Sequence, residues 1–232
     1  MIHTGSRGFG WNIANHFFKM DKDLKCHRDL IALEYNSNLG QNYYNLHNMA
    51  ANFAIVNRYL IIEAIKESLN EIFKNCESEL VYEISHNLVQ QEFGKFIHRK
   101  GATRAFPTMD GKEAHPIIIP GSMADGAALL IGLEGAKESL YSINHGSGRV
   151  FGREHAKRTL NQNTINEYMA NIKQTFNGIE IEGILVNGRN VPMDESKDCY
   201  KNLDKILNAV EVSGLAKVMD RMYPIAVIKG DE

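Results

Sequence analysis

Three histidines have sequence surroundings that suit chemistry. His3 and His86 each lie beside small or polar residues at an expected loop or strand end, and neutral imidazole is a good ligand for transition metals. No HxH or HxxxH spacing links the two, so each also fits a structural role, and spacing alone does not make them a site. His145 precedes a glycine-rich turn, where an exposed ring nitrogen can attack phosphorus.

Two glycine turns and a set of cations could bind phosphate. The turns are Gly121-Ser122-Met123 and Gly146-Ser147-Gly148. Most such turns only reverse the chain, but their backbone N–H groups can also hold phosphate oxygens. The cations suited to phosphate are Arg99, Lys100, Arg104 and Arg149. The alternative is that these cations belong to a solvated loop.

The elements that must position these residues alternate between helices and strands. Helices are predicted at 12–20, at 50–73 from hydrophobic periodicity, at 134–141, and at 164–176, which opens with a Thr164–Glu167 capping box. Residues 203–219 are predicted to form one or two helices around Gly214. Strands are predicted at 80–84, 93–98, 116–120, 179–186 and 224–228. Residues 21–48 are polar, Asn-rich and aperiodic, which predicts a long surface loop. The alternation favours one unit of mixed α and β class.

Composition excludes several classes of protein. The chain has 232 residues, of which 44% are hydrophobic and 23% charged, as in ordinary globular proteins. A net charge of −2 means that any nucleic-acid site must be local. Three dispersed cysteines without CxxC spacing indicate neither a disulfide framework nor a zinc site. The sequence has no membrane-spanning apolar run and no secretion-signal pattern, so we expect a cytoplasmic protein.

Short motifs recur in a recognisable order along nearly the whole chain. The first is His3-Thr4-Gly5-Ser6-Arg7-Gly8, followed by an AxxxAxxNR-like helix at residues 51–58 and by Ser85-His86-Asn87. Four more are HRKGAT from His98, PGSM from Pro120, HGSGR from His145 and IKG from Ile228. In this order they resemble the RtcB family of GTP-dependent RNA-splicing ligases, whose own first motif is HSGSRG.

The resemblance implies a role for each matching residue. His3 and His86 match histidines that bind Mn²⁺, and His145 matches the histidine that GMP modifies covalently. The metal would align the GTP phosphates so that His145 attacks the α-phosphorus and pyrophosphate leaves. The positions that match the guanylate surroundings are His86, Asn87, Pro120, Gly121, Ser122, Met123, Ala127, His145, Gly146, Ser147, Gly148, Tyr200 and Lys229.

The chain also departs from the family pattern. Family members carry, before the first motif, an aspartate and a cysteine that bind metal and a GGGNHF segment with a further histidine ligand; none of these occurs here. Ala127 and Gly152 stand where serine is usual. We therefore expect residues 1–232 to form the C-terminal, guanylate-binding portion of an RtcB-like ligase fold that is incomplete on its N-terminal side.

The activity implied by the resemblance is RNA ligation in tRNA splicing or RNA repair. A 2′,3′-cyclic phosphate or 3′-phosphate end would be joined to a 5′-hydroxyl through a histidine–GMP intermediate, with GTP and Mn²⁺ required. The implied partners are RNA such as tRNA halves, an N-terminal ligase portion on a separate chain, and an archease-like activator, with no membrane. Two alternatives are a degenerate guanylate- or RNA-binding module and a metal-dependent phosphohydrolase that uses His3 and His86.

Overall fold

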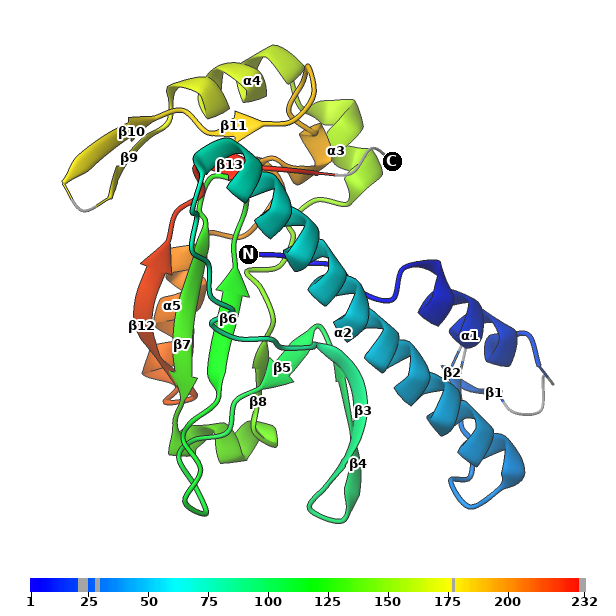
Figure 1. The fold of residues 1–232 in the computed structure, drawn as a ribbon. Coiled ribbons are helices and arrows are strands. Elements are labelled where there is room, and N and C mark those ends of the chain that lie inside the picture. The colour runs from blue at the N-terminus through cyan, green and yellow to red at the C-terminus, as the bar shows by residue number, and fades with distance from the viewer. Residues whose placement is uncertain (21–24, 28–29, 177, 230–232) are drawn as a thin grey trace. The chain divides into compact units, whose positions relative to one another are not determined.

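The chain forms two compact units in a computed structural model that describes residues 1–20, 25–27, 30–176 and 178–229. Unit 1 spans Met1–Lys100 and unit 2 spans Gly101–Glu232 (Figure 1). The sequence favoured a single unit. The division arises because the helices and hairpins of the first hundred residues pack mainly among themselves.

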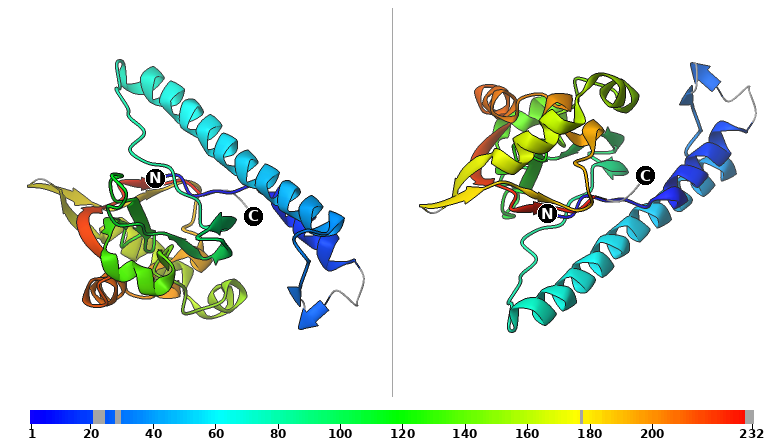
Figure 2. Two further views of the ribbon diagram at one scale, coloured as in Figure 1. Left: turned by 90° about the horizontal axis from the view of Figure 1, so that it is seen from below. Right: turned by 90° about the horizontal axis from the view of Figure 1, so that it is seen from above.

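The described residues of unit 1 include two α-helices and two pairs of antiparallel strands. Helix α1 (Gly8–Phe18) lies alongside the N-terminal half of α2 (Asn38–Phe73), where the Phe9 and Phe53 rings are 5.4 Å apart (Figure 2). The two antiparallel hairpins join β1 (Lys25–His27) to β2 (Leu30–Ile31) and β3 (Asn87–Glu92) to β4 (Lys95–Lys100). The predicted helix at 12–20 is confirmed, but it begins four residues earlier, inside the glycine-rich motif.

Helix α2 is longer than the sequence predicted. It begins at Asn38, where the Ser37 hydroxyl accepts a hydrogen bond from the Gly40 amide, so the predicted loop at 21–48 is wrong over its last eleven residues. Residues 21–24 and 28–29 of that loop lie outside the described residues. From Asn38 to Asn57 no Asp, Glu, Lys or Arg occurs. Exposed apolar side chains spaced three or four residues apart form an apolar stripe along this helix: Met49, Phe53, Val56 and Leu60.

Unit 2 is built on an antiparallel sheet in the order β12-β7-β6. Its strands are β6 (Pro116–Pro120), β7 (Ala127–Gly132) and β12 (Ala216–Met222). Side chains alternate along β6, with Ile117 and Ile119 fully buried, because successive strand residues point to opposite faces. Helix α5 (Leu203–Val212) contributes buried Leu203, Leu207 and Val210 to the same core and lies on one face of the sheet (Figure 1).

The rest of unit 2 surrounds this sheet with short elements. A second apolar cluster includes Met123, Ile165 and Met169. The helices are η2 (Glu134–Ser139), α3 (Arg153–Thr159), α4 (Gln162–Asn171), η3 (Met193–Glu195) and η4 (Lys197–Cys199). The paired strands are β5 (Ala102–Arg104) with β8 (Ser142–Asn144), β9 (Lys173–Phe176) with β10 (Ile179–Glu182), and β11 (Leu185–Val186) with β13 (Ala226–Val227).

Several predicted elements differ from the structure. Residues 80–84 form no strand. The side chain of Asn161, rather than a Thr164–Glu167 capping box, caps α4, which ends at Asn171 and leaves 173–176 to a strand. Within 203–219 the helix ends before Gly214, whose φ is +66°, and the chain continues as β12. In the part of the chain that the structure describes, no helix is both long and apolar enough to cross a membrane.

Candidate active site

In unit 1 the structure brings together two histidines that are 83 residues apart. The Nε2 atoms of His3 and His86 are 2.9 Å apart, and the rings meet edge to face with centroids separated by 5.0 Å. At this distance one ring donates a proton and the other accepts it, which requires at least one neutral imidazole. The hydrogen bond thus holds the two Nε2 atoms side by side.

The residues next to both histidines are held by the middle of α2. The Asn57 amide donates to the Gly5 carbonyl at 3.0 Å. The Arg58 guanidinium donates from Nη1 to the Thr4 carbonyl at 3.0 Å and from Nη2 to the Ser85 hydroxyl at 2.9 Å. These contacts explain how two segments that lie far apart in the sequence come to meet at one place.

The histidine pair fits a metal ion in part. Two nitrogen ligands at about 2.1 Å from one ion, at angles of about 90–110°, lie about 3.0–3.4 Å apart, close to the separation found here. Among the described residues, no group of three or more His, Cys, Asp and Glu side chains lies together as a metal site would require. Unit 1 can thus contribute two imidazole ligands, and the metal role of His3 and His86 remains a prediction.

In unit 2, His145 directly follows β8 and is fixed through its backbone. Its amide donates to the Gly101 carbonyl at 3.2 Å. Gly101 has a φ of +68°, and a Cβ atom at this position would lie 3.4 Å from Nδ1 and Cε1 of the His145 ring. The glycine of the HRKGAT motif therefore supplies a turn that other residues rarely adopt and leaves space beside the imidazole.

The two predicted glycine turns lie against each other. The Ser147 amide donates to the Pro120 carbonyl at 2.9 Å, and the Asn144 side chain donates to the Gly146 carbonyl at 2.9 Å. Ser147 is only 3% exposed, and its hydroxyl has no hydrogen-bond partner among the described residues. A buried hydroxyl without a partner is costly, and a bound phosphate or nucleobase would satisfy it.

The first turn is stabilised internally. The Ser122 hydroxyl donates to the Asp125 carboxylate at 2.8 Å and accepts from the Ala124 and Asp125 amides at 3.2 Å, while the Met123 side chain is buried in the second apolar cluster. Ala127 is buried at the start of β7, opposite Pro120. The side chains of this turn, and the amides of Gly121, Ala124, Asp125 and Gly126, are thus engaged within the turn itself.

Tyr200 and Lys229 meet at a carboxylate that the sequence analysis did not single out. The Tyr200 hydroxyl donates to Oε2 of Glu195 at 2.5 Å, and Nζ of Lys229 lies 3.5 Å from the same oxygen. The Lys201 amide donates to the Gly148 carbonyl at 2.9 Å, which places Tyr200 beside the second glycine turn. The acidic pair Asp194-Glu195 just before Tyr200 was the available sequence signal.

Charges around Glu195 shift the titration of this group. Burial by itself raises the pKa of the Glu195 carboxyl, but the Tyr200 hydrogen bond and the cations Lys229, Arg149 and Arg153 outweigh it, so the pKa lies below its ordinary value. Burial, and then the hydrogen bond to Glu195, raise the pKa of Tyr200 well above its ordinary value. At neutral pH the site therefore presents an anionic Glu195 and a protonated Tyr200.

The expected cationic set is not one exposed surface. The side chain of Arg99 is 1% exposed and donates to both carboxylate oxygens of Glu92, at 3.0 and 2.6 Å, so its charge is neutralised inside the β3–β4 hairpin. Arg149 donates to the Phe151 carbonyl, the Tyr200 hydroxyl and the Asp194 carbonyl, which makes it part of the internal network. The donors of both residues are thus engaged within the protein, and a contact of either one with RNA remains a prediction.

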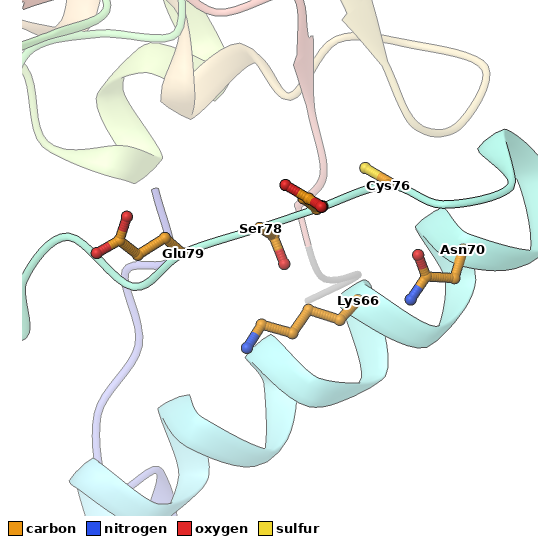
Figure 3. A pocket seen from close by; sticks show the side chains of 6 residues that line it. Lys66, Asn70, Cys76, Ser78 and Glu79 are labelled. Atoms are coloured by element: carbon orange, nitrogen blue, oxygen red, sulfur yellow. The ribbon is translucent and has the colours of Figure 1, made fainter.

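The remaining predicted residues are distributed over both units. Lys100 is exposed at the end of β4, and Arg104 is half-buried at the end of β5. Asn87 is exposed at the start of β3, next to His86. A hollow beside the C-terminal half of α2 contains none of the predicted site residues (Figure 3); it is lined by Lys66, Asn70, Cys76, Glu77, Ser78 and Glu79.

Comparisons with known proteins cover nearly the whole chain. A sequence model of the family described as "tRNA-splicing ligase RtcB" matches residues 1–230. Proteins of that name are 35% identical in Pyrococcus horikoshii over 260 residues and 35% identical in Aeropyrum pernix over 258 residues. Each alignment covers 99% of this chain, but 29% of the Pyrococcus protein and 52% of the Aeropyrum protein. The chain thus spans about half the length, or less, of the relatives that it matches.

Proposed function

Because the chain belongs to the RtcB family of tRNA-splicing ligases, we propose that it is the guanylate-binding portion of a cytoplasmic RNA ligase for tRNA splicing or RNA repair. The RNA ends would be a 2′,3′-cyclic phosphate or 3′-phosphate and a 5′-hydroxyl. The observation that carries the proposal is the junction of the two glycine turns, where the buried Ser147 hydroxyl, two residues after His145 in the sequence, has no hydrogen-bond partner among the described residues. Family membership does not favour the alternative of a degenerate binding module.

His145 is the proposed nucleophile. An unprotonated ring nitrogen would attack the α-phosphorus of GTP, so that a P–N bond forms and the bond to the leaving pyrophosphate breaks. GMP would then pass to the RNA 3′-phosphate, and attack by the 5′-hydroxyl would release GMP and join the ends. Backbone amides of both glycine turns and the Ser147 hydroxyl would hold phosphate or guanine edges, with Tyr200 and Lys229 at the far side of the second turn.

The metal that the family implies would be held in part by His3 and His86. When bound, Mn²⁺ would supply Lewis-acid polarisation and neutralise phosphate charge. The remaining ligands would come from an N-terminal ligase portion, supplied on a separate chain or encoded before this sequence, and an archease-like protein is a further proposed partner. By itself the described chain would bind Mn²⁺ weakly, because affinity falls with the number and charge of the ligands.

The test of the nucleophile is the mass of the protein after reaction. Together with Mn²⁺, GTP and the N-terminal portion of a relative such as the Aeropyrum protein, the chain should gain one GMP that is lost in mild acid, as expected for a phosphoramidate. His145→Ala should abolish the adduct, whereas His155→Ala, which changes an exposed histidine of α3, should retain it. An adduct on the His145→Ala protein would refute the assignment, and release of phosphate without ligation would favour the phosphohydrolase.

RNA binding is proposed to depend on Lys100 and Arg104. Each phosphate contact contributes a slope of about 0.7–0.9 to the dependence of log affinity on log salt concentration. Lys100→Gln with Arg104→Gln should therefore weaken RNA binding and flatten this slope, whereas Lys205→Gln, on the exposed side of α5, should do neither. An unchanged slope in the double variant would show that these two residues do not contact RNA.

A further inference from the structure

The segments that carry His3 and His86 have no regular structure to hold them. Residues 1–5 precede α1 without helix or strand, and residues 76–85 are equally irregular up to His86, just before β3. Hydrogen bonds between paired β-strands therefore do not set the distance between the His3 and His86 rings. Their separation of 2.9 Å requires tethers from another element.

We propose that Arg58 is a positioning residue that sets the spacing of the His3–His86 pair. Its guanidinium contacts the residue after one histidine, through the Thr4 carbonyl at 3.0 Å, and the residue before the other, through the Ser85 hydroxyl at 2.9 Å. One rigid planar group thus spans both segments. The proposal rests on the proposed metal role of the pair, but it concerns geometry that exists without metal.

The surroundings of Arg58 suit such a role. Its side chain is 11% exposed and pairs with Glu83, two residues before Ser85, so the ion pair also ties the His86 segment to α2. The helix holds the arginine near the middle of its length, away from fraying ends. Asn57, the preceding residue, adds a second tether to the His3 segment through the Gly5 carbonyl.

Charge alone cannot do what the guanidinium does. Arginine presents separate Nη1 and Nη2 donors in a fixed fork, whereas lysine presents a single ammonium on a flexible stem. Arg58→Lys keeps the charge that faces Glu83 but loses the simultaneous contacts to Thr4 and Ser85. The variant therefore separates positioning from simple charge neutralisation.

The unit also contains a matched control. Arg99 forms a second arginine–glutamate pair with Glu92 that is more deeply buried, with side chains 1% and 9% exposed. Arg99→Lys should cost at least as much stability as Arg58→Lys. If Arg58 were only a structural residue, the two variants would affect the histidine pair alike.

The experiment measures the pair in two ways on the full chain. Nitrogen-15 NMR of the metal-free protein reports the tautomers of His3 and His86, and electron paramagnetic resonance reports binding of Mn²⁺ alone. In Arg58→Lys we expect the coupled tautomer signature to be lost and Mn²⁺ affinity to fall about tenfold, within the range for residues that orient metal ligands. Arg99→Lys should change neither, and circular dichroism should show both variants folded.

The outcomes are decisive in both directions. An unchanged tautomer signature and unchanged Mn²⁺ affinity in Arg58→Lys, or an equal loss in Arg99→Lys, would overturn the proposal. If Arg58→Lys does not fold, Ser85→Ala removes one of the Arg58 contacts with the His86 segment without changing charge and should show a smaller loss; no loss in that variant would count against the proposal. Neither measurement needs GMP transfer, so failure of the proposed ligase function would appear separately, in the mass test of His145.

Discussion

The two histidine sites are held in different ways. In unit 1, His3 and His86 lie in irregular segments. Side chains of α2 hold these segments by hydrogen bonds to residues near each histidine. In unit 2, His145 follows a strand directly, and backbone hydrogen bonds join its turn to Gly101 and Pro120. The first arrangement depends on which side chains are present, whereas the second depends on which conformations the backbone can adopt.

This difference predicts which substitutions each site tolerates. A site held by side chains should lose its geometry when one long polar side chain is shortened. A site held by the backbone should tolerate most side-chain changes but fail at glycines whose conformation or close contacts exclude a Cβ atom. The following predictions test the second half of this contrast, from the largest expected effect to the smallest.

Gly126 should be the least replaceable position of the first turn. Its φ is +74°, and a Cβ atom would lie 2.0 Å from the Met222 carbonyl oxygen. Gly126→Ala should therefore lower the free energy of unfolding by about 3–5 kcal/mol, from backbone strain and steric overlap together. Urea denaturation measures the loss. Gly152→Ser, at a position with open space and ordinary φ, should change stability little, and equal losses in both would contradict this argument.

Gly101→Ala should act on His145 rather than on the fold alone. The new methyl group would contact the imidazole, and the φ of +68° would be strained by about 1–3 kcal/mol. GMP adduct formation in the reconstituted ligase should fall about tenfold or more, because small displacements of a nucleophile are costly. Gly214→Ala has nearly the same φ, +66°, and no neighbour within 4 Å, so it should share the strain but keep the adduct.

The two turn serines should respond in opposite ways. Ser122→Ala removes a hydroxyl that makes three hydrogen bonds and should cost about 1–2 kcal/mol of stability. Ser147→Ala removes a buried hydroxyl without a partner among the described residues, so stability should stay the same or rise, while GTP affinity should fall. Thermal melts with and without GTP give both quantities. A marked loss of stability in Ser147→Ala would mean that its hydroxyl already has a partner.

Glu195 should make a small, pH-dependent contribution. Its folded-state pKa lies below the ordinary value of 4.5, so the stability that it provides is present above about pH 4.5 and is lost as pH falls through the lower, folded pKa. Glu195→Gln should remove this part of the acid sensitivity. Denaturation curves between pH 3 and 7, a range chosen to include the roughly one-unit spread of carboxyl pKa values, compare the two proteins. If the stability of the two proteins falls in parallel as the pH is lowered, the Glu195 carboxylate does not contribute to the acid sensitivity.

Part of the fold could be predicted because local patterns matched it. The apolar run of β6 between two prolines and the periodic second half of α2 were found where expected. The start of α2 was missed because asparagines favour loops locally, while packing against α1 overrides that preference. Strand β7 was missed because its residues, Ala127 to Gly132, include only one β-branched side chain, Ile131, and no aromatic one.

The candidate site was predictable to the extent that motifs mark it. The two glycine turns and the histidines were identified from the sequence, and the structure joins the turns to each other and His3 to His86. Glu195 and the tethering contacts of Arg58 were not identified. Their partners lie up to 54 residues away in the sequence, and such pairings have no local signature. The burial of Arg99 inside a hairpin was not foreseen either, because a cluster of cations in the sequence does not indicate which of them is buried.

The apolar stripe on α2 has a consequence for the protein in solution. Met49, Phe53, Val56 and Leu60 are exposed on a helix whose first half carries no Asp, Glu, Lys or Arg. From Met49 to Val56 the stripe lies on a stretch without charged side chains, so two molecules that meet there have little local like-charge repulsion to oppose their association. We expect self-association of the purified chain to strengthen as sulfate is added, because excluded salts favour apolar burial, and to weaken in dilute urea. Self-association in a concentrated sample would thus depend on the hydration of this apolar surface more than on the net charge of the protein.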